Sequence, residues 1–161
     1  MREIKEIERR FLMKKLPNVN WDKIYEICQY YIKDGDLTKR LRRKSDVTGS
    51  ESINNSYEYL HKIQKGVGEF IEVHEEVDAD KYRELAPTAF KVVLKDRYVH
   101  IANGLHFEVD KINGVNLVIM EVELENINQE IVFPPIIEEQ IIMEVTGIRE
   151  LSNANLATLL K

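Results

Sequence analysis

Charged residues recur at every second position in several segments, and this alternation is the feature that most constrains the fold. Arg40 and Arg42 share one parity, as do Glu121 and Glu123, whereas the residues between them are apolar. A repeat of two is the period of a β-strand, whose successive side chains point to opposite faces of a sheet. The sequence therefore predicts a mainly β protein in which one face of several strands is charged.

Nine segments fit this period or are rich in strand-forming residues, and turn signals separate several of them. Two of the signals are Asn-Gly pairs, Asn103-Gly104 and Asn113-Gly114, which favour tight hairpins. The predicted strands are Glu3–Met13, Ile24–Ile32, Leu37–Lys44, Ser56–Gln64, Glu69–Val77, Phe90–Ala102, Leu105–Lys111, Leu117–Glu125 and Ile141–Val145.

Helices are expected in two places. Asp78–Leu85 starts at an aspartate and stops before a proline, and Asn153–Leu160 is a short amphipathic terminus. Asn20–Gln29 could be helical instead of a strand, because its apolar residues also recur at helix spacing. Ser45–Asn55 is polar and is predicted to be a mobile loop.

Many strands joined by hairpins favour either a sandwich or a barrel. For a single strand, a charged face most often meets solvent. Across the strands, however, acidic and basic pairs fall mostly on different strands, which favours a wide barrel with a polar interior. The predicted fold is α+β and mainly β: a closed eight-stranded antiparallel barrel with flanking helices, in a single domain of residues 1–161.

The overall charge limits the ligands and partners that fit this chain. The formal net charge is −5, so a polyanionic ligand requires a local basic pocket and no nucleic acid partner is expected. Cys28 is the only cysteine, which excludes a disulfide framework within one chain. No segment reads as a signal peptide or a membrane span. We expect a cytoplasmic protein without a membrane partner, and a homodimer that covers part of the apolar exterior.

The charged motifs follow one another in an order that resembles a known family. They are Glu6-Ile7-Glu8-Arg9-Arg10, Gln29-Tyr30-Tyr31-Ile32, Arg40-Leu41-Arg42, Lys62, Lys95-Asp96-Arg97-Tyr98, Phe107-Glu108-Val109-Asp110, Met120-Glu121-Val122-Glu123-Leu124 and Glu144-Val145-Thr146-Gly147. This series resembles the CYTH domain, or triphosphate tunnel metalloenzyme, family, whose first strand carries Glu-x-Glu-x-Lys. Arg10 stands here in place of that lysine.

One tunnel strand departs from the family pattern. Members usually carry Arg-x-Glu-x-Glu on the fourth tunnel strand, and the best match in this chain is Phe70-Ile71-Glu72-Val73-His74. The arginine and the second acid are therefore missing. A shifted register would offer Glu72, His74 and Glu76 instead.

The resemblance implies that the motif residues face a tunnel that binds a triphosphate together with Mg²⁺ or Mn²⁺. Carboxylates are hard oxygen donors that suit these ions, and arginine binds phosphate oxygens bidentately. Placing acids and bases on separate strands is expected to keep them from forming ion pairs with one another. The expected phosphate-binding residues are Arg10, Arg40, Arg42, Lys62, Lys95 and Arg97. The expected metal ligands are Glu6, Glu8, Glu72, Asp110, Glu121 and Glu123, and the expected catalytic residues are Glu6, Glu8, Lys95, Glu121 and Glu123.

The function that follows is metal-dependent hydrolysis of inorganic tripolyphosphate or of a nucleoside or organic triphosphate. Adenylate cyclisation is an alternative, although no sequence feature identifies the base pocket that it requires. A non-catalytic triphosphate-binding module is the second alternative, and the departures at Phe70 and His74 favour it.

Overall fold

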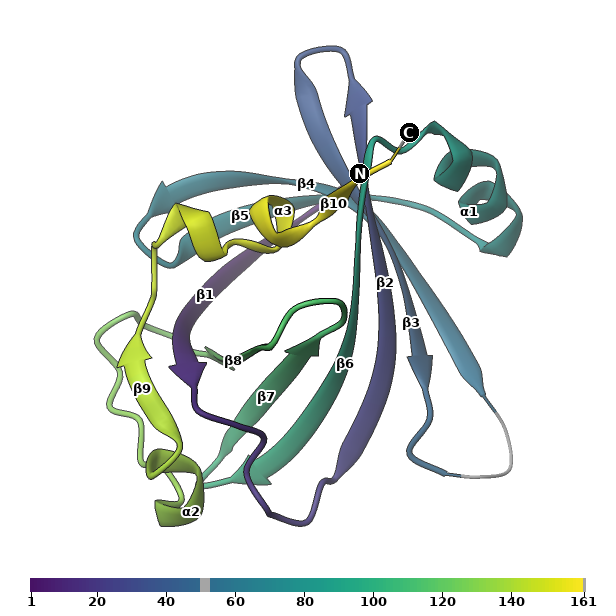
Figure 1. The fold of residues 1–161 in the computed structure, drawn as a ribbon. Helices are drawn as coiled ribbons and strands as arrows, with labels where there is room; N and C mark the ends of the chain where they lie inside the picture. Colours follow the sequence, from purple (N-terminus) through teal and green to yellow (C-terminus); the bar gives the residue numbers. More distant parts are fainter. Residues whose placement is uncertain (50–52, 161) are drawn as a thin grey trace.

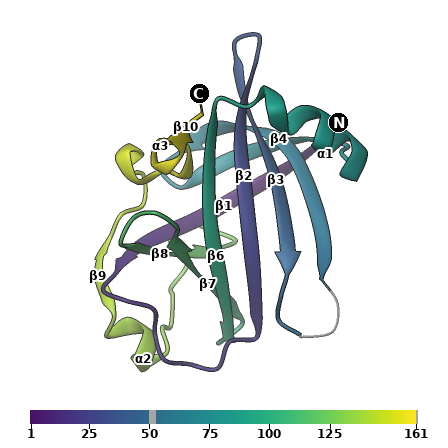
Figure 2. The ribbon, with the colours of Figure 1, turned by 45° about the vertical axis from the view of Figure 1, so that its right-hand side comes forward.

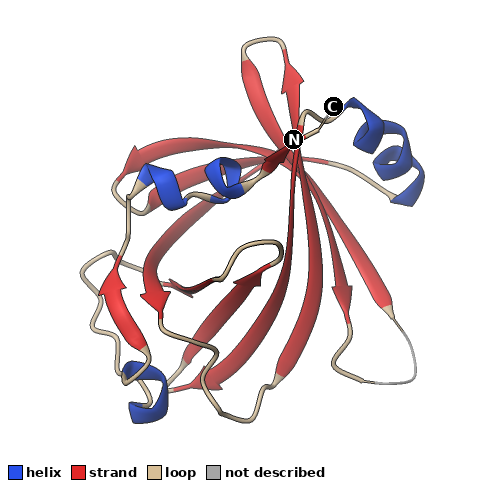
Figure 3. Cartoon of the chain, in the orientation of Figure 1, coloured by secondary structure: helices blue, strands red, loops and turns tan. Residues whose placement is uncertain are grey.

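The strands of the computed structural model, which describes residues 1–49 and 53–160, close into a barrel (Figure 1; Figure 2). Strands dominate the chain and the helices are short (Figure 3). No helix among the described residues is long and apolar enough to cross a membrane. The elements are β1 (Arg2–Met13), β2 (Lys23–Asp34), β3 (Leu37–Asp46), β4 (Asn54–Gly66), β5 (Glu69–Glu75), α1 (Ala79–Leu85), η1 (Ala86–Thr88), β6 (Lys91–Ala102), β7 (Leu105–Ile112), β8 (Leu117–Glu123), α2 (Pro135–Glu138), β9 (Ile141–Glu144), η2 (Arg149–Leu151), α3 (Asn153–Leu156) and β10 (Thr158–Leu159).

Eight of these strands form the ring in the order β6-β2-β3-β4-β5-β1-β8-β7, and β7 pairs back onto β6. Neighbouring strands are antiparallel throughout the ring. The short strands β9 and β10 add to β1 and β6. The predicted α+β, mainly β fold with a closed eight-stranded antiparallel barrel is confirmed.

The tight turn between β6 and β7 follows from its two residues. Asn103 and Gly104 have φ angles of 55° and 74°, the left-handed conformation that a two-residue hairpin turn of this type requires. Glycine adopts this conformation without a steric penalty, and asparagine tolerates it better than most residues. The hairpin predicted from this Asn-Gly pair is confirmed.

The main apolar core lies outside the ring. Phe11 of β1, Phe107 of β7 and Met120 of β8 are almost completely buried in one cluster with Ile137 of α2. The ring of Phe133 packs against Phe11 and Phe107, with centroids 5.2 Å and 5.9 Å apart. The segment after β8 therefore covers this part of the exterior, as the path of α2 and β9 beside the barrel shows (Figure 1).

A second exterior cluster lies beneath α1. Tyr82 of α1 packs against Ile32, Leu41 and Tyr59 on the outer faces of β2, β3 and β4. The side chain of Asp78 caps this helix by accepting a hydrogen bond from the backbone N–H of Lys81, which confirms the predicted helix start. The chain itself covers these faces, and the homodimer stays a prediction.

Three local expectations were wrong or incomplete. Residues 23–29, which the helical alternative for Asn20–Gln29 includes, lie in β2, because pairing with β3 and β6 on both edges outweighs helix spacing. The expected helix Asn153–Leu160 is only one turn long, and Thr158–Leu159 pairs with β6 instead. Within Ser45–Asn55, β3 extends to Asp46 and β4 begins at Asn54, while residues 50–52 lie outside the described residues.

Replacement of Phe107 by alanine should destabilise the protein by about 3 to 5 kcal/mol, because it leaves a cavity in a fully buried cluster. The free energy of unfolding in urea measures this effect. Ile142→Ala is the control, since Ile142 on β9 is 53% exposed and its truncation should cost within about 0.5 kcal/mol. Equal losses in both variants would show that the exterior cluster is not the core.

Candidate functional site

The strands β6, β2 and β3 form a basic wall of the barrel lumen. Arg42 lies opposite Gln29 in the β2–β3 pair, and the Gln29 side-chain oxygen accepts hydrogen bonds from Nε and Nη2 of Arg42 at 2.9 Å and 2.6 Å. Burial, together with the charges of Arg40 and Arg97, lowers the pKa of Arg42 to about 10. The lowered pKa of Arg42 therefore reflects several cations that lie close together in the buried lumen.

The strands β1, β8 and β7 form the facing acidic wall. Glu8 lies opposite Glu123 in the β1–β8 pair, and Glu121 lies opposite Glu108 in the β7–β8 pair. Burial and the charge of Glu121 raise the pKa of Glu8 to about 8. Partial burial and the charges of Glu108 and Glu6 raise the pKa of Glu123 to about 7. The acidic wall therefore carries more negative charge than its surroundings balance.

Ion pairs join the two walls at their deepest point. Arg97 donates two hydrogen bonds to Asp110, at 2.8 Å and 2.9 Å, and the Lys95 ammonium lies 2.7 Å from the same carboxylate. Burial raises the pKa of Asp110, but the charges of Arg97 and Lys95 outweigh it and leave that pKa lowered. Burial lowers the pKa of Lys95 to about 8 despite the charge of Asp110.

Two further pairs lie nearer the end of the lumen. The Lys62 ammonium on β4 is 2.7 Å from a Glu6 oxygen on β1, and Nε of Arg10 is 3.4 Å from Glu121. The expectation that separate strands keep acids and bases apart was wrong for these residues, because long side chains reach across one or two strands.

The fourth tunnel strand of the family pattern corresponds to β5. In its register Glu72 lies opposite Lys62, and His74 lies opposite Leu60, so Phe70, Glu72 and His74 face the lumen. His74 Nε2 lies 3.1 Å from Glu72 Oε1. Of the residues that the shifted register offers, Glu72 and His74 lie on β5, whereas Glu76 lies beyond its end at Glu75.

Every residue of the expected site faces the lumen, although the roles of these residues stay predictions. Sequence reasoning missed Glu58, which lies within 3.4 Å of Arg40 and 3.3 Å of Arg42. It also missed Glu108, which lies 3.3 Å from Arg97. The period of two could have identified both residues, because Glu58 has the same parity as Lys62 and Glu108 the same parity as Asp110.

A cavity of about 400 Å³ opens at one end of the lumen. The cations Arg10, Arg40 and Lys62 line it, together with residues of the segment that follows β9. Arg10 and Arg40 are both more than nine-tenths buried, and the Nε atom of each has no hydrogen-bond partner among the described residues. Although Arg10 Nε lies 3.4 Å from Glu121, it forms no hydrogen bond with it. A buried guanidinium N–H without a hydrogen bond is costly, so this cavity is suited to an anion.

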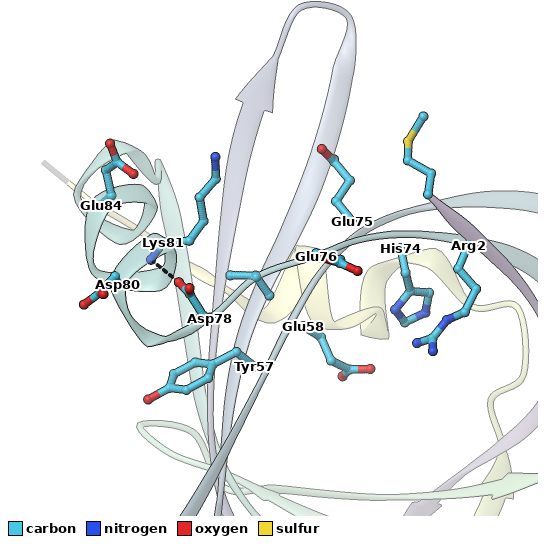
Figure 4. Close-up of a pocket in the computed structure, with 12 residues that line it drawn as sticks. Arg2, Tyr57, Glu58, His74, Glu75, Glu76, Asp78, Asp80, Lys81 and Glu84 are labelled. Carbon is cyan, nitrogen blue, oxygen red and sulfur yellow. Dashed lines mark hydrogen bonds between the residues drawn. The ribbon is translucent and has the colours of Figure 1, made fainter.

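A second cavity, of about 850 Å³, lies between β5 and α1 (Figure 4). His74, Arg2 and Glu58 point toward one another at its inner side, where the lumen ends (Figure 4). Its outer part is acidic, with Glu76, Asp80 and other carboxylates on the segment that follows β5. The two ends of the lumen thus differ in charge, and the end near Arg10 is the one suited to a polyanion.

Two crystal structures of the protein NE1496 are similar to this chain over nearly all of both chains. In one, NE1496 is described as a hypothetical protein, with 27% identity, a TM-score of 0.59, and coverage of 96% of this chain and 99% of that chain. In the other, it is described as an inorganic triphosphatase, with 26% identity, a TM-score of 0.58, and coverage of 98% and 97%. A conserved hypothetical protein from Pyrococcus furiosus shares the fold, at 20% identity and a TM-score of 0.53 over 75% of this chain and 79% of that chain.

The fold of this chain resembles that of the CYTH, or triphosphate tunnel, family. The closed barrel with its charged lumen and the similarity to NE1496 together support this assignment. No family model and no curated protein matches the sequence.

The resemblance to this family implies a divalent cation, and the acidic wall of the barrel fits one by its chemistry. In the part of the chain that the structure describes, neither Glu8 nor Glu123 forms an ion pair. Glu108 and Glu123 line a hollow of about 380 Å³ that gives access to this wall. Within residues 1–49 and 53–160, however, no group of three or more metal-binding side chains is already assembled. The acids therefore supply suitable oxygen donors without a preformed cage.

The free energy of unfolding of the metal-free protein should fall as the pH rises from about 4.5 to about 8. In this window the folded protein keeps a proton on Glu8 that the unfolded chain has already lost, so rising pH favours unfolding, on the order of a few kcal/mol in total. Glu8→Gln should weaken this dependence and raise the melting temperature at pH 8, with little change at pH 5.

Glu138→Gln is the matched control, since Glu138 is an exposed acid on α2. Thermal melts of the three proteins across this pH range measure the effect. Parallel profiles for wild type and Glu8→Gln would contradict the raised pKa.

Proposed function

We propose that this chain is a phosphohydrolase that removes the terminal phosphate group from inorganic tripolyphosphate or from a nucleoside or organic triphosphate. The observation that carries this proposal is the cavity of about 400 Å³ in which Arg10 and Arg40 present buried guanidinium groups, whose Nε atoms form no hydrogen bond among the described residues, beside Lys62. The similarity to the inorganic triphosphatase NE1496, at 26% identity over nearly the whole chain, supports the same reaction class.

The basic residues are proposed to bind and orient the phosphate chain. A triphosphate carries about four negative charges, and such charge is buried only against cations and hydrogen-bond donors. Arg40 and Arg42 share the single carboxylate of Glu58, at 3.4 Å and 3.3 Å, so part of their charge remains for a ligand. Lys62 and Arg10 add cations at the cavity wall.

Lys95 and Arg97 are proposed to act deeper in the lumen. Asp110 holds both cations, so we assign Asp110 to their positioning more than to direct metal binding. With a pKa of about 8, Lys95 keeps its proton at neutral pH and remains a hydrogen-bond donor for a phosphate oxygen.

Glu6, Glu8, Glu121 and Glu123 are proposed to hold Mg²⁺ or Mn²⁺. When bound, such an ion supplies charge neutralisation of the phosphate chain and lowers the pKa of a coordinated water. Glu72 contacts both His74 and Lys62, at 3.1 Å and 3.6 Å, and is proposed to support the set by orienting Lys62.

Orthophosphate release from tripolyphosphate in the presence of Mg²⁺ or Mn²⁺ tests this function. Arg40→Gln and Glu121→Gln should each lower kcat/KM by roughly hundredfold or more, because the first removes a cation proposed to bind phosphate and the second a carboxylate proposed to hold the metal ion. Arg43→Gln is the control, since Arg43 lies on the outer face of β3 and is exposed.

The same assay distinguishes the alternatives when ATP, pyrophosphate and thiamine triphosphate are included as substrates. Cyclic AMP from ATP would indicate a cyclase, and tight binding without turnover would indicate a binding module. A wild-type protein that releases no orthophosphate from any triphosphate, or a fully active Glu121→Gln variant, would contradict the proposal.

A further inference from the structure

The segment of residues 146–156, here called the C-terminal strap, crosses one end of the barrel (Figure 1; Figure 2). It contains η2 and α3, and its residues Ala154 and Leu156 pack against Tyr31, Val93 and Ile112 at the end of the lumen. The strap therefore forms a wall of the lumen and is not a free tail.

Lumen cations anchor the strap. Arg10 Nη1 donates a hydrogen bond to the backbone oxygen of Leu151 at 2.7 Å, and Lys95 Nζ donates to the side-chain oxygen of Asn153 at 3.3 Å. Lys91 Nζ donates to the backbone oxygen of Ala154 at 3.1 Å. These bonds fix the strap relative to residues that are proposed to bind phosphate.

Hydrogen bonds hold the backbone of Arg149 in place, whereas its side chain forms none among the described residues. Its carbonyl oxygen accepts hydrogen bonds from Asn155 Nδ2 at 2.6 Å and from the backbone N–H of Ser152 at 3.1 Å. Among residues 1–49 and 53–160, no hydrogen bond or ion pair engages its guanidinium group. Arg149 is among the residues that line the cavity of about 400 Å³, and it is exposed, so its side chain is accessible to a ligand there.

The cavity therefore has two walls of different origin. Arg40 and Lys62 line it from β3 and β4, whereas Arg149 and Ser152 line it from the strap. A phosphate chain long enough to bridge both walls gains a charge-assisted hydrogen bond to Arg149. A shorter chain held on the barrel wall does not.

We propose that Arg149 is a specificity-determining residue that binds an end phosphate group of a linear triphosphate and thereby favours it over a diphosphate. This inference rests on the proposed function for its substrate class. It assigns to the strap a part in the binding of substrate that the barrel motifs alone do not supply.

The test compares Arg149→Gln and Arg149→Lys with wild type on tripolyphosphate and pyrophosphate. Arg149→Gln should raise KM for tripolyphosphate about tenfold with little change in kcat, since it removes one charge-assisted contact. KM for pyrophosphate, where it is hydrolysed, should change less than about twofold, and Arg149→Lys should recover part of the loss because it keeps the charge. Arg83→Gln is the matched control, since Arg83 is an exposed arginine on α1 that pairs with Asp80.

A thermal-shift titration with tripolyphosphate and with pyrophosphate provides a readout that does not require turnover. A weaker tripolyphosphate shift in Arg149→Gln supports the inference even if the wild type proves inactive, in which case only the proposed function fails. Unchanged tripolyphosphate binding in Arg149→Gln, or an equal loss for both ligands, would overturn the inference. A wild type that binds neither ligand would overturn both.

Discussion

The arrangement of the lumen depends on one buried interaction, the contact of Asp110 with both Lys95 and Arg97. All three side chains are at most 6% exposed, so each would be costly to bury alone. Arg97 also lies 3.3 Å from Glu108 and 3.4 Å from Glu121, so carboxylates of β7 and β8 hold both cations of β6 in place. These ion pairs join the basic wall to the acidic wall and fix the positions of two cations that are proposed to contact a phosphate chain.

Because charged side chains occupy much of the lumen, the main apolar core lies outside the ring. The C-terminal segment contributes to both regions. Phe133 and Ile137 cover the outer face of β1, β7 and β8. Further along the same segment, the strap returns to the end of the lumen and lines the cavity there. The same segment therefore covers the apolar exterior and places the strap at the cavity.

Much of the lumen could be predicted because parity alone decides which side of a strand a residue faces. Arg40 and Glu121 lie where their spacing places them. Parity does not say how far a side chain reaches, which is why the pairing of Lys62 with Glu6 was missed. The place of Arg149 could not be predicted either, since no local pattern records that the strap packs against Tyr31 and Val93.

The departures on β5 are consistent with the same charge balance. Relative to the family pattern Arg-x-Glu-x-Glu, Phe70 removes one cation and His74 removes one acid, so the two replacements together leave the net charge of the lumen unchanged. The Lys62 ammonium lies 5.0 Å from the centre of the Phe70 ring, a distance suited to a cation–π contact.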